Sequence, residues 1–352
     1  MALKVGVIGN GGISRCHARG YKALGDRVEI VACCDIVEEK AKAFAEEFDV
    51  KNYYTDCKTM LEENELDLVS VCTWNSAHAE CTIAALNAGC NVICEKPMAM
   101  NAQQAIEMKE AAEKNGKLLM VGFVRRQGND AAAAIDFINK GYLGDIYFAK
   151  ATYLRRCGFP GGWFGNKSLS GGGPLIDLGV HVIDLTRYIM GNPRPVTVFG
   201  ATFDKIGARS HIKTTAWESE TVVEKPVFDV EDLAVAMIRF DNGAVLQVET
   251  SFNLNTKSSS GDIELFGDKA GLTLEPFELH TECNGRIADI SISGDNGFDF
   301  DRDFNREIKN FADAVEGKAQ CIATADDGVE LMKILDAVYL SAKTGKSVDI
   351  AR

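Results

Sequence analysis

The sequence predicts an α/β N-terminal domain with a Rossmann-type parallel sheet, followed by an α+β C-terminal domain with a large, open, mainly antiparallel sheet. Up to about residue 123, short apolar runs alternate with helical patterns, which is the rhythm of βαβ units. Beyond it, apolar runs follow one another without helices between them, as in antiparallel sheets. We therefore expect two domains, residues 1–123 and 124–352, with the last helices able to pack back on the first.

The composition excludes several classes of protein. A chain of 352 residues with 46% apolar and 25% charged residues is typical of a two-domain globular protein. A net charge of −13 argues against nucleic acid as a partner, because phosphate binding needs clustered Lys and Arg. No apolar run approaches the ~18–20 residues of a membrane span, and the chain starts directly with a strand. We expect no membrane association, no signal peptide and a cytoplasmic location.

Eleven cysteines could suggest disulfides or a metal site. Cys33, Cys34 and Cys72 lie inside apolar runs, however, and no pair has Cys-x-x-Cys spacing. Small buried thiols in a reducing compartment explain this placement best. We expect no bound metal.

The first domain is expected to place its ligands at one edge of the sheet, because open parallel sheets bind at the carboxyl ends of their strands. The expected strands are Leu3–Ile8, Val28–Cys34, Leu68–Thr73, Asn91–Cys94 and Lys117–Phe123. The expected helices are Ser14–Leu24, Val37–Phe48, Ser76–Ala88 and Asn101–Asn115. The candidate residues are those that follow each strand.

The first strand is followed by Gly9-Asn10-Gly11-Gly12-Ile13-Ser14 and then a helical pattern. This is Gly-x-Gly-x-x-Ser, with a small serine in place of the third glycine of a dinucleotide-binding turn. The first glycine permits the tight turn, and the second lets the backbone approach a pyrophosphate at the helix N-terminus. The turn therefore predicts a nucleotide site.

Asp35 ends the second strand, 26 residues after Gly9. A carboxylate there accepts hydrogen bonds from both ribose hydroxyls and repels a 2′-phosphate, so it favours NAD over NADP. Asp35 could also cap the next helix, and the two roles are compatible.

Glu95-Lys96-Pro97 follows a central strand. The proline keeps Lys96 out of the helical region, and an ammonium group there can bind a sugar hydroxyl and stabilise a developing alkoxide. A surface Glu–Lys pair is the plainer alternative.

In the second part of the chain, Gly171–Asp184 stands out. Pro174 can begin a helix that runs to about Met190, with Asp177, His181 and Asp184 on one face. Asp177 and His181 could form an acid–base pair beside a cavity. The alternative is a buried histidine that a neighbouring aspartate satisfies.

The rest of the second part predicts a sheet and a covering loop. The loop Arg155–Asn166 is rich in glycine, arginine and aromatic residues. We expect it to lie over a sugar pocket, with Trp163 stacking on the sugar and Arg155 and Arg156 donating to its hydroxyls. The alternative is a loop that covers the core and whose arginines only pair with acids. The helices are expected at Asn129–Lys140, Phe304–Val315 and Thr324–Thr344, and the strands at Ile146–Tyr153, Val196–Phe203, Phe228–Phe240, Ala244–Phe252 and Asp262–Gly267. A broad sheet with an uncovered face predicts a homo-oligomer, a dimer or tetramer. The sequence reveals no role for Asp204–Lys225.

These motifs, in this order and spacing, resemble the glucose–fructose oxidoreductase/inositol dehydrogenase/rhizopine catabolism (Gfo/Idh/MocA) family over essentially the whole chain. The resemblance implies hydride transfer between NAD and a sugar, polyol or glycoside carbon. It implies a catalytic set of Lys96, Asp177 and His181. Thr73-Trp74-Asn75 departs from the family's usual small residue and proline, while His78 keeps its place.

The resemblance and the strand ends together give the expected site. The cofactor residues are Gly9, Asn10, Gly11, Gly12, Ile13, Asp35, Thr73, Trp74, Asn75, His78, Glu95, Lys96 and Arg125. The substrate residues are Lys96, Arg125, Arg126, Tyr153, Arg155, Trp163, Asp177 and His181. His181 is expected to take the hydroxyl proton, Asp177 to orient the imidazole and Lys96 to stabilise the oxyanion.

The expected activity is oxidation of a pyranose or glycoside at a ring hydroxyl, with C3 preferred. A myo-inositol or polyol 2-dehydrogenase is the alternative within the class. Two alternatives lie outside it: a non-catalytic NAD-binding regulator, and a metal-dependent hydrolase that uses Asp177, His181 and Asp184.

Overall fold

The computed structural model describes residues 2–212, 217–219 and 227–351. The chain divides into two compact units, each described here by itself. The first comprises residues 1–124 and 299–332, and the second comprises residues 125–298 and 333–352. The first segment of the first unit ends at Val124, one residue after the expected boundary at residue 123. Residues 299–332 also belong to the first unit.

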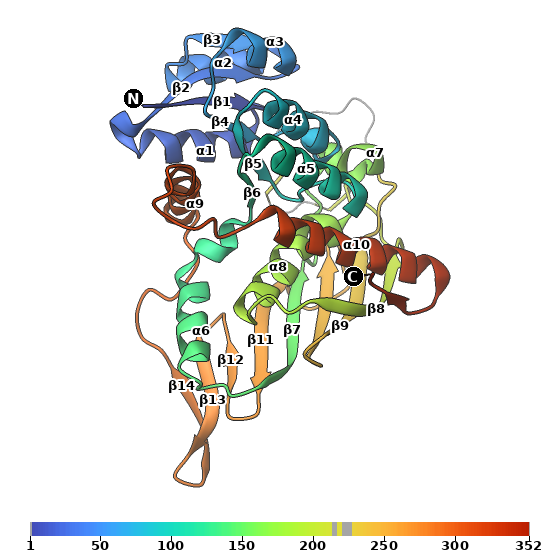
Figure 1. Cartoon of the computed structure of the whole chain (residues 1–352). Helices are drawn as coiled ribbons and strands as arrows, with labels where there is room; N and C mark the ends of the chain where they lie inside the picture. The colour runs from blue at the N-terminus through green and yellow to red at the C-terminus, as the bar shows by residue number, and fades with distance from the viewer. Residues whose placement is uncertain (1, 213–216, 220–226, 352) are drawn as a thin grey trace. The chain divides into compact units, whose positions relative to one another are not determined.

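The first unit is a six-stranded parallel sheet in the order β3-β2-β1-β4-β5-β6, with helices on its faces (Figure 1). Its strands are β1 (Leu3–Ile8), β2 (Val28–Cys34), β3 (Asn52–Tyr54), β4 (Leu68–Val71), β5 (Asn91–Glu95) and β6 (Leu119–Gly122). Its helices are α1 (Gly12–Lys22), α2 (Glu38–Phe48), α3 (Cys57–Glu63), α4 (Asn75–Asn87), α5 (Ala102–Asn115), α9 (Phe300–Val315) and the beginning of α10 (Ala325–Thr344). The strands are apolar runs because helices cover both faces of such a sheet.

The strand order reverses between β1 and β4, which pair in parallel. Ligands bind outside the carboxyl ends of the strands at such a switch point. The turn after β1 and the turn after β4 therefore flank the expected nucleotide crevice.

The second unit is a nine-stranded sheet in the order β14-β13-β12-β11-β7-β10-β9-β8-β15. Its strands are β7 (Ile146–Leu154), β8 (Pro195–Phe203), β9 (Leu233–Phe240), β10 (Val245–Ser251), β11 (Ser260–Gly267), β12 (Gly271–Thr273), β13 (Glu278–Cys283), β14 (Arg286–Ser291) and β15 (Val348–Asp349). Among the described strands, β10 pairs with β7 in parallel and the other pairs are antiparallel. The mainly antiparallel sheet is confirmed.

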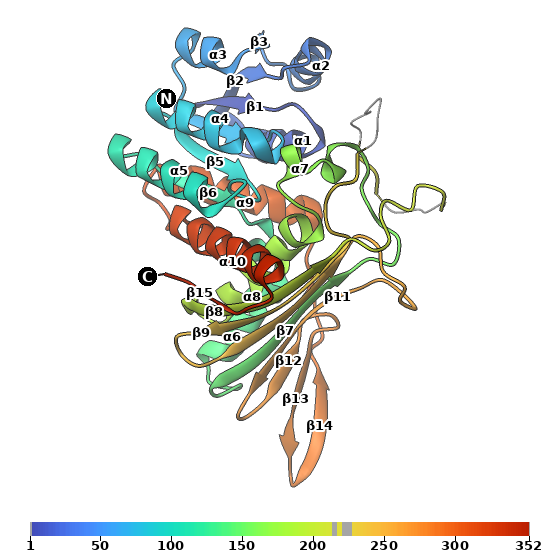
Figure 2. The same cartoon turned by 90° about the vertical axis from the view of Figure 1, so that its right-hand side faces the viewer.

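Helices cover one face of this sheet. They are α6 (Asn129–Asn139), α8 (Val180–Ile189) and the end of α10, with the short α7 (Lys167–Ser170) nearby. Figure 2 shows α8 lying along the strands of this sheet. The alternation in β8 follows from this: Val198 is fully buried, whereas the side chain of Phe199 is 52% exposed.

The expected strands and helices are present, with ends that differ by a few residues. The largest shift is in β9, which begins at Leu233 and not at Phe228. The short elements β3, α3 and β12–β15 were not expected. The polar segment Asp204–Lys225 lies partly outside the described residues. In the part of the chain that is described, no helix has the length and apolar character needed to cross a bilayer.

Candidate active site

The glycine turn lies between β1 and α1. Gly9 has a φ of +86°, and a Cβ there would lie 2.6 Å from the Cys72 carbonyl, so only glycine fits. Gly11 and Gly12 have open space where a Cβ would project. Ser14 is fully buried and donates to the Gly11 carbonyl at 2.6 Å, so a small residue suffices at the third position.

The residues of this turn fit a dinucleotide. The N-terminus of α1 has no side-chain cap, which leaves its first amides for an anion. The Asn10 side chain is 1% exposed, yet its Oδ1 and Nδ2 have no hydrogen-bond partner among the described residues. A buried amide without partners is costly unless a ligand supplies them.

Asp35 follows β2 and is tied to the glycine turn. Its Oδ2 accepts a hydrogen bond from the Asn10 backbone N–H at 2.8 Å, and its Oδ1 accepts one from the Val37 N–H at 2.9 Å. The carboxylate is therefore held at the edge of the turn, where a ribose diol is expected. The hydrogen bond from the Val37 N–H also shows that Asp35 binds the backbone just before α2.

The loop after β4 leads into α4. Trp74 is the N-cap residue of α4, and Asn75 is its buried first residue. His78 is also buried, with its ring nitrogens 2.7 Å from the Pro97 carbonyl oxygen and 3.1 Å from that of Thr73. Burial lowers the pKa of His78 despite these carbonyls. His78 thus ties two strand-end loops together, a role that sequence reasoning did not include.

Glu95 ends β5, and Lys96 follows it. The Glu95 carboxylate is 5% exposed, accepts a hydrogen bond from the Lys96 N–H at 3.1 Å and lies 2.9 Å from His17 Nε2. Burial acts to raise the pKa of Glu95, but the hydrogen bond and charge of His17, with Lys96, lower it overall. Glu95 therefore holds the Lys96 backbone from inside the unit. The Lys96–Pro97 peptide bond is cis.

Two further buried groups lie around Glu95. His17 Nδ1 is 3.0 Å from Ser70 Oγ, which in turn is 2.8 Å from the Tyr21 hydroxyl. Glu307 on α9 is fully buried, and neither of its oxygens has a partner among the described residues. Burial, and then the charge of Glu95, raise the pKa of Glu307 well above its usual range.

His17, Glu95 and Glu307 form the only group of metal-ligand type found among the described residues. Sequence reasoning missed it, because the three residues come from distant elements. The metal-dependent hydrolase alternative used Asp177, His181 and Asp184, which form no such group in the described part of the chain.

The segment with Asp177 and His181 is helical from Pro174, as expected, but its first turn is not α-helical. Leu175–Gly179 is a π-helix that continues directly into α8. Asp177 is buried within this π turn and His181 is partly exposed in the first turn of α8. The first turn thus departs from the expected α-helix, and the shared face of Asp177, His181 and Asp184 stays a prediction. Single π turns within helices are frequent at functional sites.

Asp184 lies one turn further along α8 and binds Arg126. Arg126 Nε lies 2.9 Å from Asp184 Oδ2, and Nη2 lies 2.6 Å from Oδ1. The two residues are 3% and 2% exposed, and the guanidinium lies over the Tyr188 ring at 4.6 Å. A bidentate buried pair of this kind fixes α8. This anchoring role was not expected; a substrate contact by Arg126 stays a prediction.

The remaining predicted substrate residues are also placed within the second unit. Arg125 binds Asp130 at 2.9 Å and lies 4.7 Å from the Phe298 ring centroid. Arg155 donates to the Gly158 carbonyl at 2.9 Å and lies over the Tyr153 ring.

The covering loop folds around its own aromatic residues. Trp163 stacks on Phe164 with ring centroids 4.1 Å apart, and Phe164 meets the edge of Trp217. This packing orders part of the loop, and the sugar pocket expected beneath it stays a prediction.

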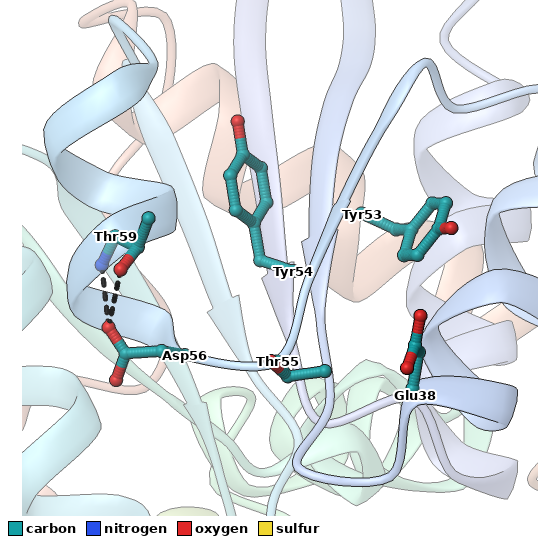
Figure 3. Close-up of a pocket in the computed structure, with 6 residues that line it drawn as sticks. All are labelled: Glu38, Tyr53, Tyr54, Thr55, Asp56 and Thr59. Carbon is teal, nitrogen blue, oxygen red and sulfur yellow. Dashed lines mark hydrogen bonds between the residues drawn. The ribbon is translucent and has the colours of Figure 1, made fainter.

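A cavity of about 290 Å³ lies at the edge of the first unit, at β3 and the start of α3. Figure 3 shows Glu38, Tyr53, Tyr54 and Thr55 around it, with Asp56 accepting hydrogen bonds from Thr59. None of the predicted site residues lines it. It lies close to Asp35, whose N–H donates to the Tyr54 carbonyl at 3.1 Å.

Comparison with known proteins gives consistent matches along the chain. Residues 3–123 match the NAD-binding Rossmann fold of an oxidoreductase family, and residues 135–350 match that family's C-terminal alpha/beta domain. D-Glucoside 3-dehydrogenase of Escherichia coli is 39% identical over 99% of this chain and 97% of its own. Levoglucosan dehydrogenase of Pseudarthrobacter phenanthrenivorans is 30% identical over 81% of this chain and 76% of its own.

Solved structures agree with this assignment. A levoglucosan dehydrogenase in complex with NADH superposes with a TM-score of 0.87 at 25% identity, covering 100% of both chains. These relatives are sugar dehydrogenases by name. The chain belongs to the Gfo/Idh/MocA family of oxidoreductases and has its NAD-binding Rossmann domain.

Proposed function

We propose that this protein oxidises a D-glucoside at the C3 hydroxyl with NAD as the hydride acceptor. The observation that carries the proposal is the 39% identity to D-glucoside 3-dehydrogenase across nearly the full length of both chains. The open glycine turn and the unpartnered Asn10 amide support the cofactor. The cofactor, when bound, takes up the hydride from the alcohol carbon.

The protein's residues then have to manage the proton and the oxygen. We propose that His181 removes the hydroxyl proton as the C–H bond breaks, which leaves a ketone. Asp177 orients the imidazole and stabilises its charged form. The Lys96 ammonium stabilises negative charge on the oxygen in the transition state.

Asn10 and Asp35 are proposed to bind the adenosine side of the cofactor, with the pyrophosphate at Gly11, Gly12 and Ile13. The strand-end residues Thr73, Trp74, Asn75 and Arg125 are proposed to complete the cofactor site. Arg125, Tyr153, Arg155 and Trp163 are proposed to hold the sugar, by hydrogen bonding and by stacking on its apolar face.

The test is an NADH absorbance assay with methyl glucosides, free sugars and myo-inositol as separate substrates. We expect turnover of the glucosides with a C3 ketone as product. Preferred oxidation of myo-inositol would favour the polyol alternative, for which a myo-inositol 2-dehydrogenase of Thermotoga maritima, 24% identical over 99% of this chain, is a relative. His181→Ala and Lys96→Ala should each lower kcat by about 10²–10⁴.

NADH binding without turnover of any of these substrates would favour the alternative of a non-catalytic NAD-binding regulator. Asp184 is bound by Arg126, so we do not propose the hydrolase.

We also propose a homo-oligomer, a dimer or tetramer, formed through the uncovered sheet face, in the cytoplasm. Phe199 and Met237, 52% and 41% exposed, are paired neighbours on β8 and β9. Phe148 and Phe266 stack at 5.4 Å on the same face. Apolar side chains on one sheet face are typical of a subunit interface. Light scattering of Phe199→Lys should show a smaller assembly than the wild type.

All eleven cysteines are free, which suits the proposed location in the cytoplasm, a reducing compartment.

A further inference from the structure

Gly172 and Gly173 lie directly before the helix with Asp177 and His181. Neither has a positive φ, so backbone conformation does not explain them. A Cβ on Gly172 would lie 2.0 Å from the Tyr339 hydroxyl oxygen, and one on Gly173 would lie 2.1 Å from the Glu231 carbonyl oxygen. The glycines are needed because Tyr339 and Glu231 approach the backbone closely.

Glu231 also binds the first amide of the helix, and Tyr339 binds Glu231. Glu231 Oε1 accepts hydrogen bonds from the Leu175 N–H at 3.2 Å and the Tyr339 hydroxyl at 2.9 Å. Because the first amides of a helix have no partner within it, they need such acceptors.

The helix lacks a cap of its own. Its N-cap residue is Pro174, which makes no side-chain cap hydrogen bond. Glu231 precedes β9 and Tyr339 lies on α10, so both residues of this cap come from other parts of the second unit. A carboxylate beside a helix N-terminus is also favoured by the helix dipole.

We propose that Glu231 and Tyr339 are positioning residues for catalysis: together they fix the π turn, and so the placement of Asp177 and His181. The inference rests on the proposed function, in which those two residues handle the proton. Asp177 follows Ile176 directly and its N–H donates to the Gly173 carbonyl at 3.1 Å. Movement of the capped turn therefore moves Asp177. Misplacement of a catalytic group by about 1 Å can cost about 10²-fold in rate.

The test compares Tyr339→Phe, Glu231→Gln and Glu231→Ala with a matched control, Ser341→Ala. Ser341 is fully buried on the same helix, donates to the Lys346 carbonyl and accepts from the Gly200 N–H. Ser341→Ala therefore removes buried hydrogen bonds from the same helix as Tyr339 but leaves the contacts of Gly172 and Gly173 in place. The readouts are kcat, KM and amide hydrogen exchange of the segment 172–177.

We expect Tyr339→Phe to lower kcat by about 10- to 100-fold with little change in KM, and to speed exchange at Leu175, whose N–H donates to the same Glu231 oxygen. Glu231→Gln keeps an acceptor oxygen and should lose less than Glu231→Ala. Ser341→Ala should resemble the wild type in kcat and in exchange of the segment.

Wild-type kcat in Tyr339→Phe, or equal losses in Ser341→Ala, would overturn the inference. Should Glu231→Ala fail to fold, Tyr339→Phe and Glu231→Gln still decide it. His181→Ala separates this outcome from failure of the proposed function. If His181→Ala is inactive while Tyr339→Phe is fully active, only the positioning role is lost. If His181→Ala is fully active, the catalytic assignment fails, and the positioning role fails with it even where exchange is faster.

Discussion

Replacing Arg126 by methionine tests whether the Arg126–Asp184 pair anchors α8. The pair is bidentate, with contacts of 2.9 and 2.6 Å, and its members are 3% and 2% exposed. Arg126→Met keeps most of the side-chain volume but leaves the Asp184 carboxylate buried without its cation. Breaking such a pair from one side costs about 3–5 kcal/mol, whereas replacing both partners by apolar residues is nearly neutral.

We therefore expect Arg126→Met to lower the free energy of unfolding by about 3–5 kcal/mol, and Arg126→Met/Asp184→Leu to recover most of that loss. Urea unfolding followed by tryptophan fluorescence measures both. Lys140→Met is the control: the side chains of Lys140 and its partner Asp136 are 61% and 60% exposed, and loss of such an exposed pair should leave the stability nearly unchanged. A loss below about 1 kcal/mol in Arg126→Met, or no recovery in the double variant, would refute the anchoring role.

Two further predictions concern the first unit. Gly12→Ala should fold with wild-type stability but bind NADH at least about 10-fold more weakly, because the new Cβ projects into open space at the cofactor turn. Gly9→Ala should lose both stability and NADH binding, because Gly9 has a φ of +86° and a Cβ there would meet the Cys72 backbone. Titration of NADH fluorescence and thermal unfolding separate the two, and equal behaviour of the variants would contradict this reading. Glu307 has a pKa raised by burial, so the folded state keeps a proton that the unfolded chain releases above its usual pKa. Its contribution to stability is therefore present at low pH and is lost as pH rises toward the folded-state pKa. Glu307→Gln does not titrate and should flatten this dependence in urea unfolding between about pH 5 and about pH 8; an unchanged pH profile would show that Glu307 is ionised in the folded protein.

The first unit was predictable because its signals are local. Buried parallel strands are continuous apolar runs, and the glycine turn sits directly between a strand and a helix. Short elements such as β3 and β12, of three residues each, have too few residues to show a period. Their pairing comes from neighbouring strands.

The site was predictable only in its residue types. The positions of Lys96, Asp177 and His181 along the chain follow from motifs, but their supports come from distant residues. Glu95 meets His17 from α1, and Arg126 meets Asp184 from α8. The π turn at Asp177 has no sequence period of its own, and the Glu231 carboxylate that accepts from the Leu175 N–H and the Tyr339 hydroxyl comes from elsewhere in the chain.

The central claim is hydride transfer from C3 of a glucoside to NAD, and specific deuterium labelling tests it most directly. Methyl glucoside deuterated at C3 should yield deuterated NADH and react more slowly than the unlabelled substrate. The same glucoside deuterated at C2 should yield unlabelled NADH at the normal rate. Transfer of label from C2, or glucoside turnover without NADH, would contradict the account.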